Sequence, residues 1–173
     1  IQILTPTKRG MLGAPSLNAM LQEVINPPSE EKAELRIGNV TFREGDKVMQ
    51  LRNNYGAEWR TELFTAEGEG VFNGDMGTVI EIDIEDKSMT VRMDDRVIEY
   101  AGDMLEEIDL AYAITVHKSQ GSEFPVVVIP VLNFPPMLMT RNLLYTAVTR
   151  GKKLVIIVGD PARVRSMIDN SRA

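Results

Sequence analysis

The chain has 173 residues, of which 43% are hydrophobic and 25% are charged, as is typical of one folded domain or of a domain with a smaller insertion. It contains no cysteine and one histidine, which excludes disulfide frameworks and thiolate metal sites and disfavours any transition-metal site. No apolar run approaches the roughly 18 residues of a membrane span and no signal-peptide pattern is present, so we expect a cytoplasmic protein without membrane partners.

The net charge of −6 is unevenly distributed along the chain. Residues 41–109 carry seven basic and eighteen acidic side chains, a net of −11, whereas residues 110–173 carry eight basic and three acidic, a net of +5. The difference indicates two bodies of different character, and only the C-terminal one favours a polyanionic partner. The alternative interpretation is that the charged side chains of both bodies are simply solvated surface residues.

The first element is a short apolar strand at residues 1–4, followed by a polar turn. Because the strand pattern begins at the first residue, we expect the chain to be part of a longer protein. Ser16 is a candidate N-cap for a helix that ends before Asn26. The apolar residues of this helix recur at helical spacing: Leu17, Met20, Leu21, Val24 and Ile25.

The hydrophobic period changes to two between residues 39 and 109. Apolar residues alternate with polar ones in short runs separated by turn sequences: Met49 and Leu51; Ile80, Ile82 and Ile84; Met89, Val91 and Met93; Ile98 and Tyr100. This alternation predicts antiparallel hairpins, and about five such strands in this length predict a small barrel. Residues 53–70 are polar and contain glycine, so we expect a mobile loop there.

Continuous apolar strands return near the C-terminus, at residues 111–116, 126–129 and 154–158, with helices at 139–149 and after Asp160-Pro161. Uninterrupted apolar strands joined by helices predict a parallel sheet. We therefore expect an α/β fold with three segments. Residues 1–38 and 110–173 form the parallel sheet, and residues 39–109 form the inserted β-barrel.

A polar loop follows the strand at 111–116, where open α/β sheets place ligand sites. In an extended segment, Thr115, His117 and Ser119 would present hydroxyl and imidazole groups on one side, which suits the backbone phosphates of a nucleic acid. Polar caps at a strand end explain the same residues. Glu123, which follows Gly121 in this loop, is suited to accept a hydrogen bond from a ribose hydroxyl.

Arg150 ends the predicted helix at 139–149, directly before the last strand. Its forked, permanently charged guanidinium suits a phosphate, although a cation at a helix C-terminus also stabilises the helix dipole. Lys8 and Arg9, at the end of the first strand, face the same ligand or solvent. The chain has no G-x-x-x-x-G-K-[ST] loop, no paired acidic motif for magnesium and no G-x-S-x-G elbow. If the chain binds a nucleotide, we expect it to contribute an arginine but not the loop that binds the phosphates.

Three sequence blocks together resemble the C-terminal half of superfamily 1 DNA helicases of the RecD/TraA-like branch, which includes exodeoxyribonuclease V alpha subunits. Residues 3–10 with Leu17-Asn18 resemble motif IV, residues 115–124 resemble motif V, and residues 144–150 resemble motif VI. The blocks at 45–50 and 73–77 resemble the SH3-like barrel inserted in that family, domain 2B. The resemblance implies that residues 1–38 and 110–173 form a RecA-like domain 2A, and that residues 39–109 form domain 2B.

The resemblance also implies roles for individual residues. Arg150 would be a catalytic arginine finger at the γ-phosphate of ATP, and Glu123 would contact the nucleotide sugar. Gly121 and Arg9 are assigned to the same nucleotide site, with Lys8 left open as an alternative to Arg9. Thr115 and His117 would contact the backbone of single-stranded DNA, together with Ser119. No residue of the chain is assigned to a metal.

The implied function is the C-terminal motor lobe of an ATP-dependent helicase that moves 5′→3′ in DNA recombination and repair. ATP and Mg²⁺ would be bound mainly by an N-terminal RecA-like domain of the same protein, so the isolated fragment is expected to be inactive. The parent protein would act on single-stranded DNA, either alone, in a recombination–repair complex or attached to a relaxase. The alternative is a noncatalytic nucleic-acid-binding or protein-binding module with a degenerate helicase-like domain.

Overall fold

The computed structural model describes residues 1–132 and 134–171 of the chain. These residues form two compact units, one made of Ile1–Ala19 with Tyr112–Ala173 and the other of Met20–Ala111. Three residues of the predicted C-terminal segment 110–173, at positions 133, 172 and 173, lie outside the described residues. None of the helices in the described ranges has the length and hydrophobicity needed to cross a membrane.

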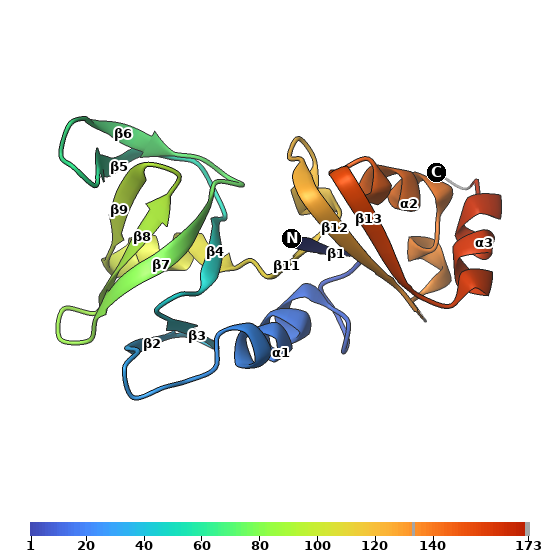
Figure 1. The fold of residues 1–173 in the computed structure, drawn as a ribbon, viewed down its shortest axis with the longest axis horizontal. Coiled ribbons are helices and arrows are strands. Elements are labelled where there is room, and N and C mark those ends of the chain that lie inside the picture. Colours follow the sequence, from blue (N-terminus) through green and yellow to red (C-terminus); the bar gives the residue numbers. More distant parts are fainter. Residues whose placement is uncertain (133, 172–173) are drawn as a thin grey trace. The chain divides into compact units, whose positions relative to one another are not determined.

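The first unit contains a parallel sheet built from both ends of the chain (Figure 1). Its strand order is β11-β1-β12-β13, and every neighbouring pair is parallel. The strands are β1 (Gln2–Thr5), β11 (Ala113–Thr115), β12 (Phe124–Val131) and β13 (Gly151–Gly159). Leu4, Ile114, Val127 and Ile129 are buried in this sheet, as the continuous apolar runs predicted. Burial of the apolar run at 154–158 was also predicted and is wrong: Leu154, Ile156, Ile157 and Val158 are exposed, because β13 is the last strand of the sheet. The predicted α/β class is confirmed.

Two α-helices lie wholly within this unit. The helix α2 (Arg141–Val148) connects β12 to β13 and packs against both strands, and α3 (Pro161–Asp169) packs against α2 (Figure 1). The Thr140 hydroxyl caps α2 by accepting from the Leu143 backbone N–H at 3.3 Å. Asp160 caps α3 in the same way, with Pro161 at the first helical position. Short 3₁₀ helices, η2 (His117–Ser119) and η3 (Pro136–Leu138), precede β12 and α2 respectively.

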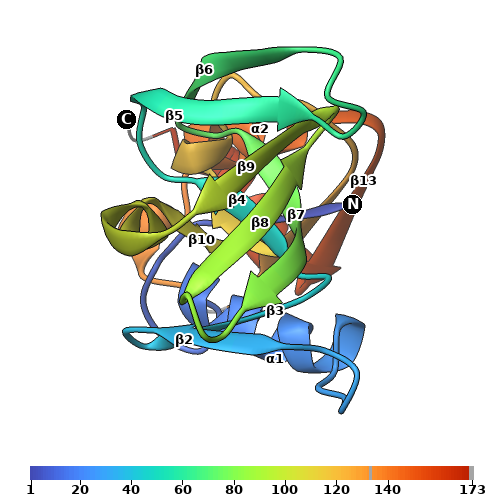
Figure 2. The same cartoon turned by 90° about the vertical axis from the view of Figure 1, so that its left-hand side faces the viewer.

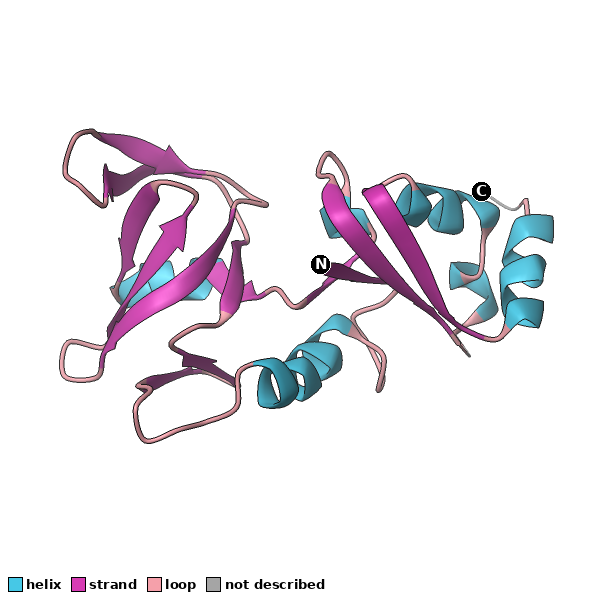
Figure 3. Cartoon of the chain, in the orientation of Figure 1, coloured by secondary structure: helices cyan, strands magenta, loops and turns pink. Residues whose placement is uncertain are grey.

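The second unit is an antiparallel β structure (Figures 2 and 3). Its seven-stranded sheet has the order β10-β4-β7-β8-β9-β5-β6, and β2 and β3 form a separate hairpin. The bounds are β2 (Glu34–Ile37), β3 (Val40–Arg43), β4 (Lys47–Gln50), β5 (Asn54–Thr61), β6 (Glu67–Val71), β7 (Met76–Asp83), β8 (Ser88–Met93), β9 (Arg96–Tyr100) and β10 (Ile108–Leu110). A 3₁₀ helix, η1 (Gly102–Glu107), precedes β10. The sheet thus has more strands than the five or so predicted.

The predicted alternation places most core residues correctly, but fails in β7. Met89, Val91, Met93, Ile98 and Tyr100 are all buried, whereas Ile80 and Ile84 are exposed. The pairing of β7 with β8 shifts register between Val79 and Glu81, so Val79 faces the core in place of Ile80, whereas Ile82 is buried as predicted and Ile84 lies beyond the end of the strand. A bulge adds one residue to a strand and so reverses the faces on its two sides.

The prediction of a mobile loop at residues 53–70 is wrong, because β5 and β6 occupy most of this segment. Trp59 lies across the backbone of Gly68, where a Cβ atom would be 2.6 Å from the indole Cζ2. The strand β5 also pairs with β9, which supplies a long-range partner. Glycine and glutamate in β6 give no hydrophobic alternation, so the pairing has no local signal in the sequence.

The helix α1 (Ala14–Ile25) begins in the first unit and ends in the second. It starts before the predicted cap, so Ser16 lies in the first turn rather than at the N-cap. The second unit extends upstream of the predicted residue 39, because Gln22 and Asn26 donate side-chain hydrogen bonds to the buried Asp46 at 2.5 and 2.8 Å. The Arg43 backbone N–H donates to the same carboxylate at 2.7 Å.

Candidate nucleotide and DNA site

Strand register places the predicted site residues at opposite ends of the parallel strands, some at the carboxyl ends and some at the amino ends. Thr5 pairs with Thr115, so the loops that follow β1 and β11 leave from the same edge, at the carboxyl ends of the strands. Phe124 pairs with Gly151, so the residues just before β12 and β13 lie at the amino ends of the strands. The loops that contain His117 and Arg9 therefore begin at the carboxyl ends of the strands, whereas Glu123 and Arg150 lie at the amino ends.

Arg150 joins the end of α2 to the loop before β12. Its guanidinium donates to the Thr146 carbonyl at 3.3 Å, to the Ser122 carbonyl at 3.2 Å and to the Thr149 hydroxyl at 3.3 Å. Its own carbonyl accepts from the Phe124 N–H at 2.8 Å. All three acceptors of the guanidinium are neutral, and no carboxylate pairs with it among the described residues. A half-buried positive charge without a counter-ion is suited to receive an anionic ligand.

The bond from Arg150 to the Thr146 carbonyl also fits the alternative interpretation, a cation at a helix C-terminus. Both interpretations are compatible with this geometry, because a guanidinium can donate to the helix end and to a ligand through different N–H groups.

Glu123 directly follows Ser122, whose carbonyl accepts a hydrogen bond from the Arg150 guanidinium. The Glu123 carboxylate forms an ion pair with Lys152 of β13, with Nζ 3.0 Å from Oε2. Both side chains are more than half exposed, so the pair contributes only about 0–1 kcal/mol and opens readily. Gly121 has a φ of +85°, in the left-handed region, with open space where a Cβ would stand. Glycine adopts this conformation without strain, which allows the turn that precedes Glu123.

The expectation that Thr115, His117 and Ser119 share one face of an extended segment is wrong. Val116 has helical dihedrals, φ −52° and ψ −38°, and the next three residues form η2. The Ser119 hydroxyl is buried and donates to the Val116 carbonyl at 2.6 Å. The Thr115 hydroxyl, also buried, accepts from the Lys118 N–H at 3.3 Å. Local hydroxyl–backbone bonds of this kind favour a turn over a strand.

Of these three residues, only His117 is exposed. Thr115 and Ser119 shape the turn, and the turn presents the imidazole to solvent. A DNA contact by His117 stays a prediction that fits its exposure, whereas side-chain contacts by the other two would require their hydroxyls to leave the turn.

Lys8 and Arg9 are exposed in the loop between β1 and α1. The loop is folded on itself: the Thr5 hydroxyl donates to the Leu12 carbonyl at 2.6 Å, and the Arg9 N–H donates to the Thr7 hydroxyl at 3.0 Å. According to the strand register, this loop leaves from the carboxyl ends of the strands, as the His117 loop does, and not from the amino ends, where Glu123 and Arg150 lie. The assignment of Arg9 to the nucleotide stays a prediction.

A buried residue that we did not predict as functional, Asn18 of α1, holds the strand before the His117 loop. Its amide nitrogen donates to the Ala113 carbonyl at 3.0 Å, and its amide oxygen accepts from the Ala113 N–H at 2.7 Å. The strand β11 is an edge strand, so the amide takes the place of a further strand. A signal existed: the amide residues Asn18 and Gln22 of α1, and Asn26 directly after it, recur every four residues.

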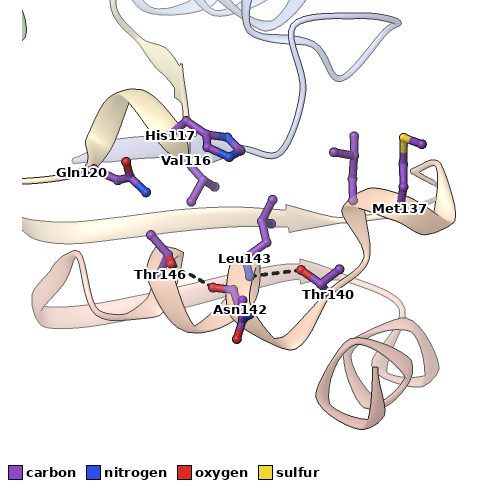
Figure 4. A pocket seen from close by; sticks show the side chains of 9 residues that line it. Val116, His117, Gln120, Met137, Thr140, Asn142, Leu143 and Thr146 are labelled. Carbon is purple, nitrogen blue, oxygen red and sulfur yellow. Dashed lines mark hydrogen bonds between the residues drawn. The ribbon is translucent and has the colours of Figure 1, made fainter. Parts of the chain in front are cut away.

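A cavity of about 330 Å³ lies beside His117 within the first unit (Figure 4). Its lining comes from three elements: Val116, His117 and Gln120 from the loop; Met137 and Leu138 from η3; Thr140, Asn142, Leu143 and Thr146 from α2 and its cap. None of these side chains is Asp, Glu, Lys or Arg. In the described ranges, no group of three or more acidic or histidine side chains is placed to hold a metal ion.

Two family models match the chain. Residues 17–93 match the SH3 domain of ATP-dependent RecD-like DNA helicases, and residues 110–158 match the UvrD-like helicase C-terminal domain. The matched segments follow one another in this order and leave only a short stretch between them.

Curated relatives agree with these models. The chain is 38% identical over 153 residues to the ATP-dependent RecD2 DNA helicase of Deinococcus radiodurans, covering 88% of this chain and 19% of that protein. It is 30% identical over 168 residues to the RecBCD enzyme subunit RecD of Mycolicibacterium smegmatis, covering 97% of this chain and 26% of that protein. The chain thus spans about a fifth to a quarter of the length of these relatives.

A solved structure shares the fold. The Pif1 helicase from Bacteroides in complex with ADP-AlF3 and ssDNA matches with a TM-score of 0.59 and 23% identity, over 96% of this chain and 42% of that one. The order of the two matched domains and the similarity to RecD2 and RecD agree with each other. The chain belongs to the RecD-like superfamily 1 helicases, of which it comprises the SH3 domain and the helicase C-terminal region.

Proposed function

We propose that this chain is the C-terminal motor region of an ATP-dependent DNA helicase and supplies the arginine that completes its ATP site. The observation that carries the proposal is the setting of Arg150. Its guanidinium is half-buried, bonded only to neutral oxygens, and attached to the loop that contains Glu123. A charge held in this way is preorganised for an anion that arrives from outside the chain.

In the proposed reaction the nucleotide phosphates and Mg²⁺ are bound by an N-terminal RecA-like domain of the same protein. The described residues of this chain include no acidic cluster for Mg²⁺, so we assign none of them to the metal. Arg150 would contact the γ-phosphate and stabilise the negative charge that develops on its oxygens during transfer to water. Glu123, released from Lys152, would accept a hydrogen bond from the nucleotide sugar.

The same loop offers a route from nucleotide to DNA. The exposed His117 lies at the start of this loop, and the Ser122 carbonyl, which accepts a hydrogen bond from Arg150, lies near its end. A change in the Arg150 contacts on ATP binding or hydrolysis would therefore shift a loop that also borders the proposed DNA contact. We propose that this loop couples hydrolysis to the grip on single-stranded DNA.

Two finer parts of the proposal rest on the relatives. Translocation in the 5′→3′ direction follows the RecD/TraA-like branch. A role in recombination and repair, within a larger complex, is supported by the similarity to a protein named as a RecBCD subunit. The acidic segment 41–109 disfavours phosphate contact over most of its surface, so we assign to it strand guidance or a protein contact.

The experiment that tests the function uses the whole protein that contains this chain. Duplexes with a 5′ or a 3′ single-stranded tail are mixed with the protein and ATP, and strand separation is followed by fluorescence. We expect unwinding of the 5′-tailed duplex only, with none when a nonhydrolysable ATP analogue replaces ATP. Unwinding of the 3′-tailed duplex alone would refute the polarity. Absence of both unwinding and DNA-stimulated ATP hydrolysis would refute the function.

A further inference from the structure

The cavity beside His117 differs from a phosphate site in its lining. It is bounded by apolar side chains, among them Val116 and Leu143, and by the neutral polar groups of Gln120, Asn142 and Thr146 (Figure 4). Phosphate sites in proteins depend on Arg, Lys or a helix N-terminus. No Arg or Lys lines this cavity, and at the start of α2, which does line it, the N–H groups of Arg141 and Leu143 already donate to the Asn170 carbonyl and the Thr140 hydroxyl. We propose that the cavity holds one nucleobase of the bound single strand, an inference that rests on the proposed function.

The chemistry of the lining fits an uncharged, flat ligand with polar edges. Carboxamides and an imidazole present both donors and acceptors, as the edge of a base does. Apolar side chains cover the faces of a base, which stack on any flat or apolar surface. The volume of about 330 Å³ is at the lower end of the range for small-molecule sites, about 300–1,000 Å³, and suits one base rather than several.

The hydrogen-bonding capacity of the polar side chains is largely unused. His117, Gln120 and Asn142 are exposed, and within residues 1–132 and 134–171 their side chains make no hydrogen bond to protein. The Thr146 hydroxyl donates to the Asn142 carbonyl at 2.8 Å and keeps its acceptor positions. These groups are therefore available to a ligand at no cost in internal bonds.

The position of the cavity places it beside the proposed contact with single-stranded DNA. His117 is both a wall of the cavity and the exposed residue predicted to contact the DNA backbone. A nucleotide whose phosphate approaches His117 can turn its base into the space between the loop and α2. One base per protein would then be held more tightly than its neighbours, which fixes the register of the strand at this point.

Abasic scanning tests this inference. The whole protein is titrated with single-stranded oligonucleotides that carry one abasic site, moved one position at a time, and affinity is read by fluorescence anisotropy. We expect one position at which loss of the base weakens binding by about 5- to 150-fold, the range that base stacking gives. Equal affinity at every position of the abasic site would overturn the inference.

Two substitutions assign the sensitive position to this cavity. The double variant Asn142→Ala and Thr146→Val removes polar groups from the lining, and alanine favours the helix at the exposed position 142. We expect it to lose most of the position-specific penalty, whereas the control Ser166→Ala, on α3, retains it. An undiminished penalty in the double variant would refute the cavity as the site. If the wild-type protein binds no single-stranded DNA at all, the proposed function itself fails.

Discussion

The side-chain amide of Asn18 makes hydrogen bonds to both backbone groups of Ala113, at 2.7 and 3.0 Å. The two residues are 95 positions apart in the sequence, which runs through the whole second unit between them. Ala113 lies in the edge strand that leads through Thr115 into the His117 loop. Asn18 is therefore a positioning residue for that loop rather than a group that meets a ligand.

Replacing Asn18 should loosen the strand at Ala113. In Asn18→Ala the Ala113 N–H and carbonyl lose their partner while they remain buried, which costs about 1–3 kcal/mol. Hydrogen exchange at the Ala113 amide should therefore accelerate, and affinity for single-stranded DNA should fall. The matched control is Asn53→Ala, which removes an exposed hydrogen bond from the Asn73 N–H. Unchanged exchange at Ala113 would refute the positioning role.

The parallel sheet was predictable because its strands are continuous apolar runs, which are typical of parallel sheets, although the run in β13 is mostly exposed in this chain. The β5–β6 hairpin was not, because Trp59 packs against the bare backbone of Gly68, and glycine carries no hydrophobic signal. The failure in β7 has a different cause. A single bulge near Ile80 exchanges the inward and outward faces, and nothing in the local sequence marks it.

The site was predictable in parts. Arg150 was found because its place between a helix and an apolar strand is readable from the sequence. The turn at His117 was missed because the hydroxyls of Thr115 and Ser119, read as ligand contacts, bond to the backbone nearby. The cavity depends on η3 and α2 approaching this loop, which is a tertiary contact that spacing along the chain does not contain.

Stability of the second unit should depend on pH through Glu107. Burial alone would raise the pKa of this carboxyl, but hydrogen bonds from Asn54, Gln50 and Arg52 outweigh it and hold the pKa below its ordinary value. Its contribution to stability is therefore fully present above the unfolded pKa of about 4.3. It is lost as pH falls from there through the lower, folded pKa.

Urea unfolding at a series of acidic pH values tests this dependence. The Glu107→Gln variant should be less stable near neutral pH, and its stability should fall less steeply as the solution is acidified. The neighbouring Glu106 is exposed, so Glu106→Gln should retain the wild-type slope. Identical slopes for Glu107→Gln and wild type would contradict the assignment.

Gly77 of β7 should tolerate no side chain. A Cβ atom there would lie 2.6 Å from the Arg92 carbonyl oxygen and 2.7 Å from side-chain carbons of Met93 and Val91. Overpacking of this kind costs about 1–3 kcal/mol, so Gly77→Ala should lower the urea midpoint of the second unit. The control is Gly56→Ala in β5, where the nearest atom would be 4.0 Å away and stability should be retained. Equal midpoints for the two variants would count against the close packing of β7 on β8.

The central claim is that Arg150 contributes to ATP hydrolysis from this part of the protein. The most direct measurement is the DNA-stimulated rate of ATP hydrolysis, kcat, in the whole protein carrying Arg150→Ala, with DNA affinity measured in parallel. We predict that kcat falls by about 10³-fold or more, as for other arginine fingers, while affinity for single-stranded DNA is retained. Arg165→Ala, which removes an exposed arginine from α3, should leave both quantities unchanged. A kcat for Arg150→Ala close to that of the wild type would contradict the account.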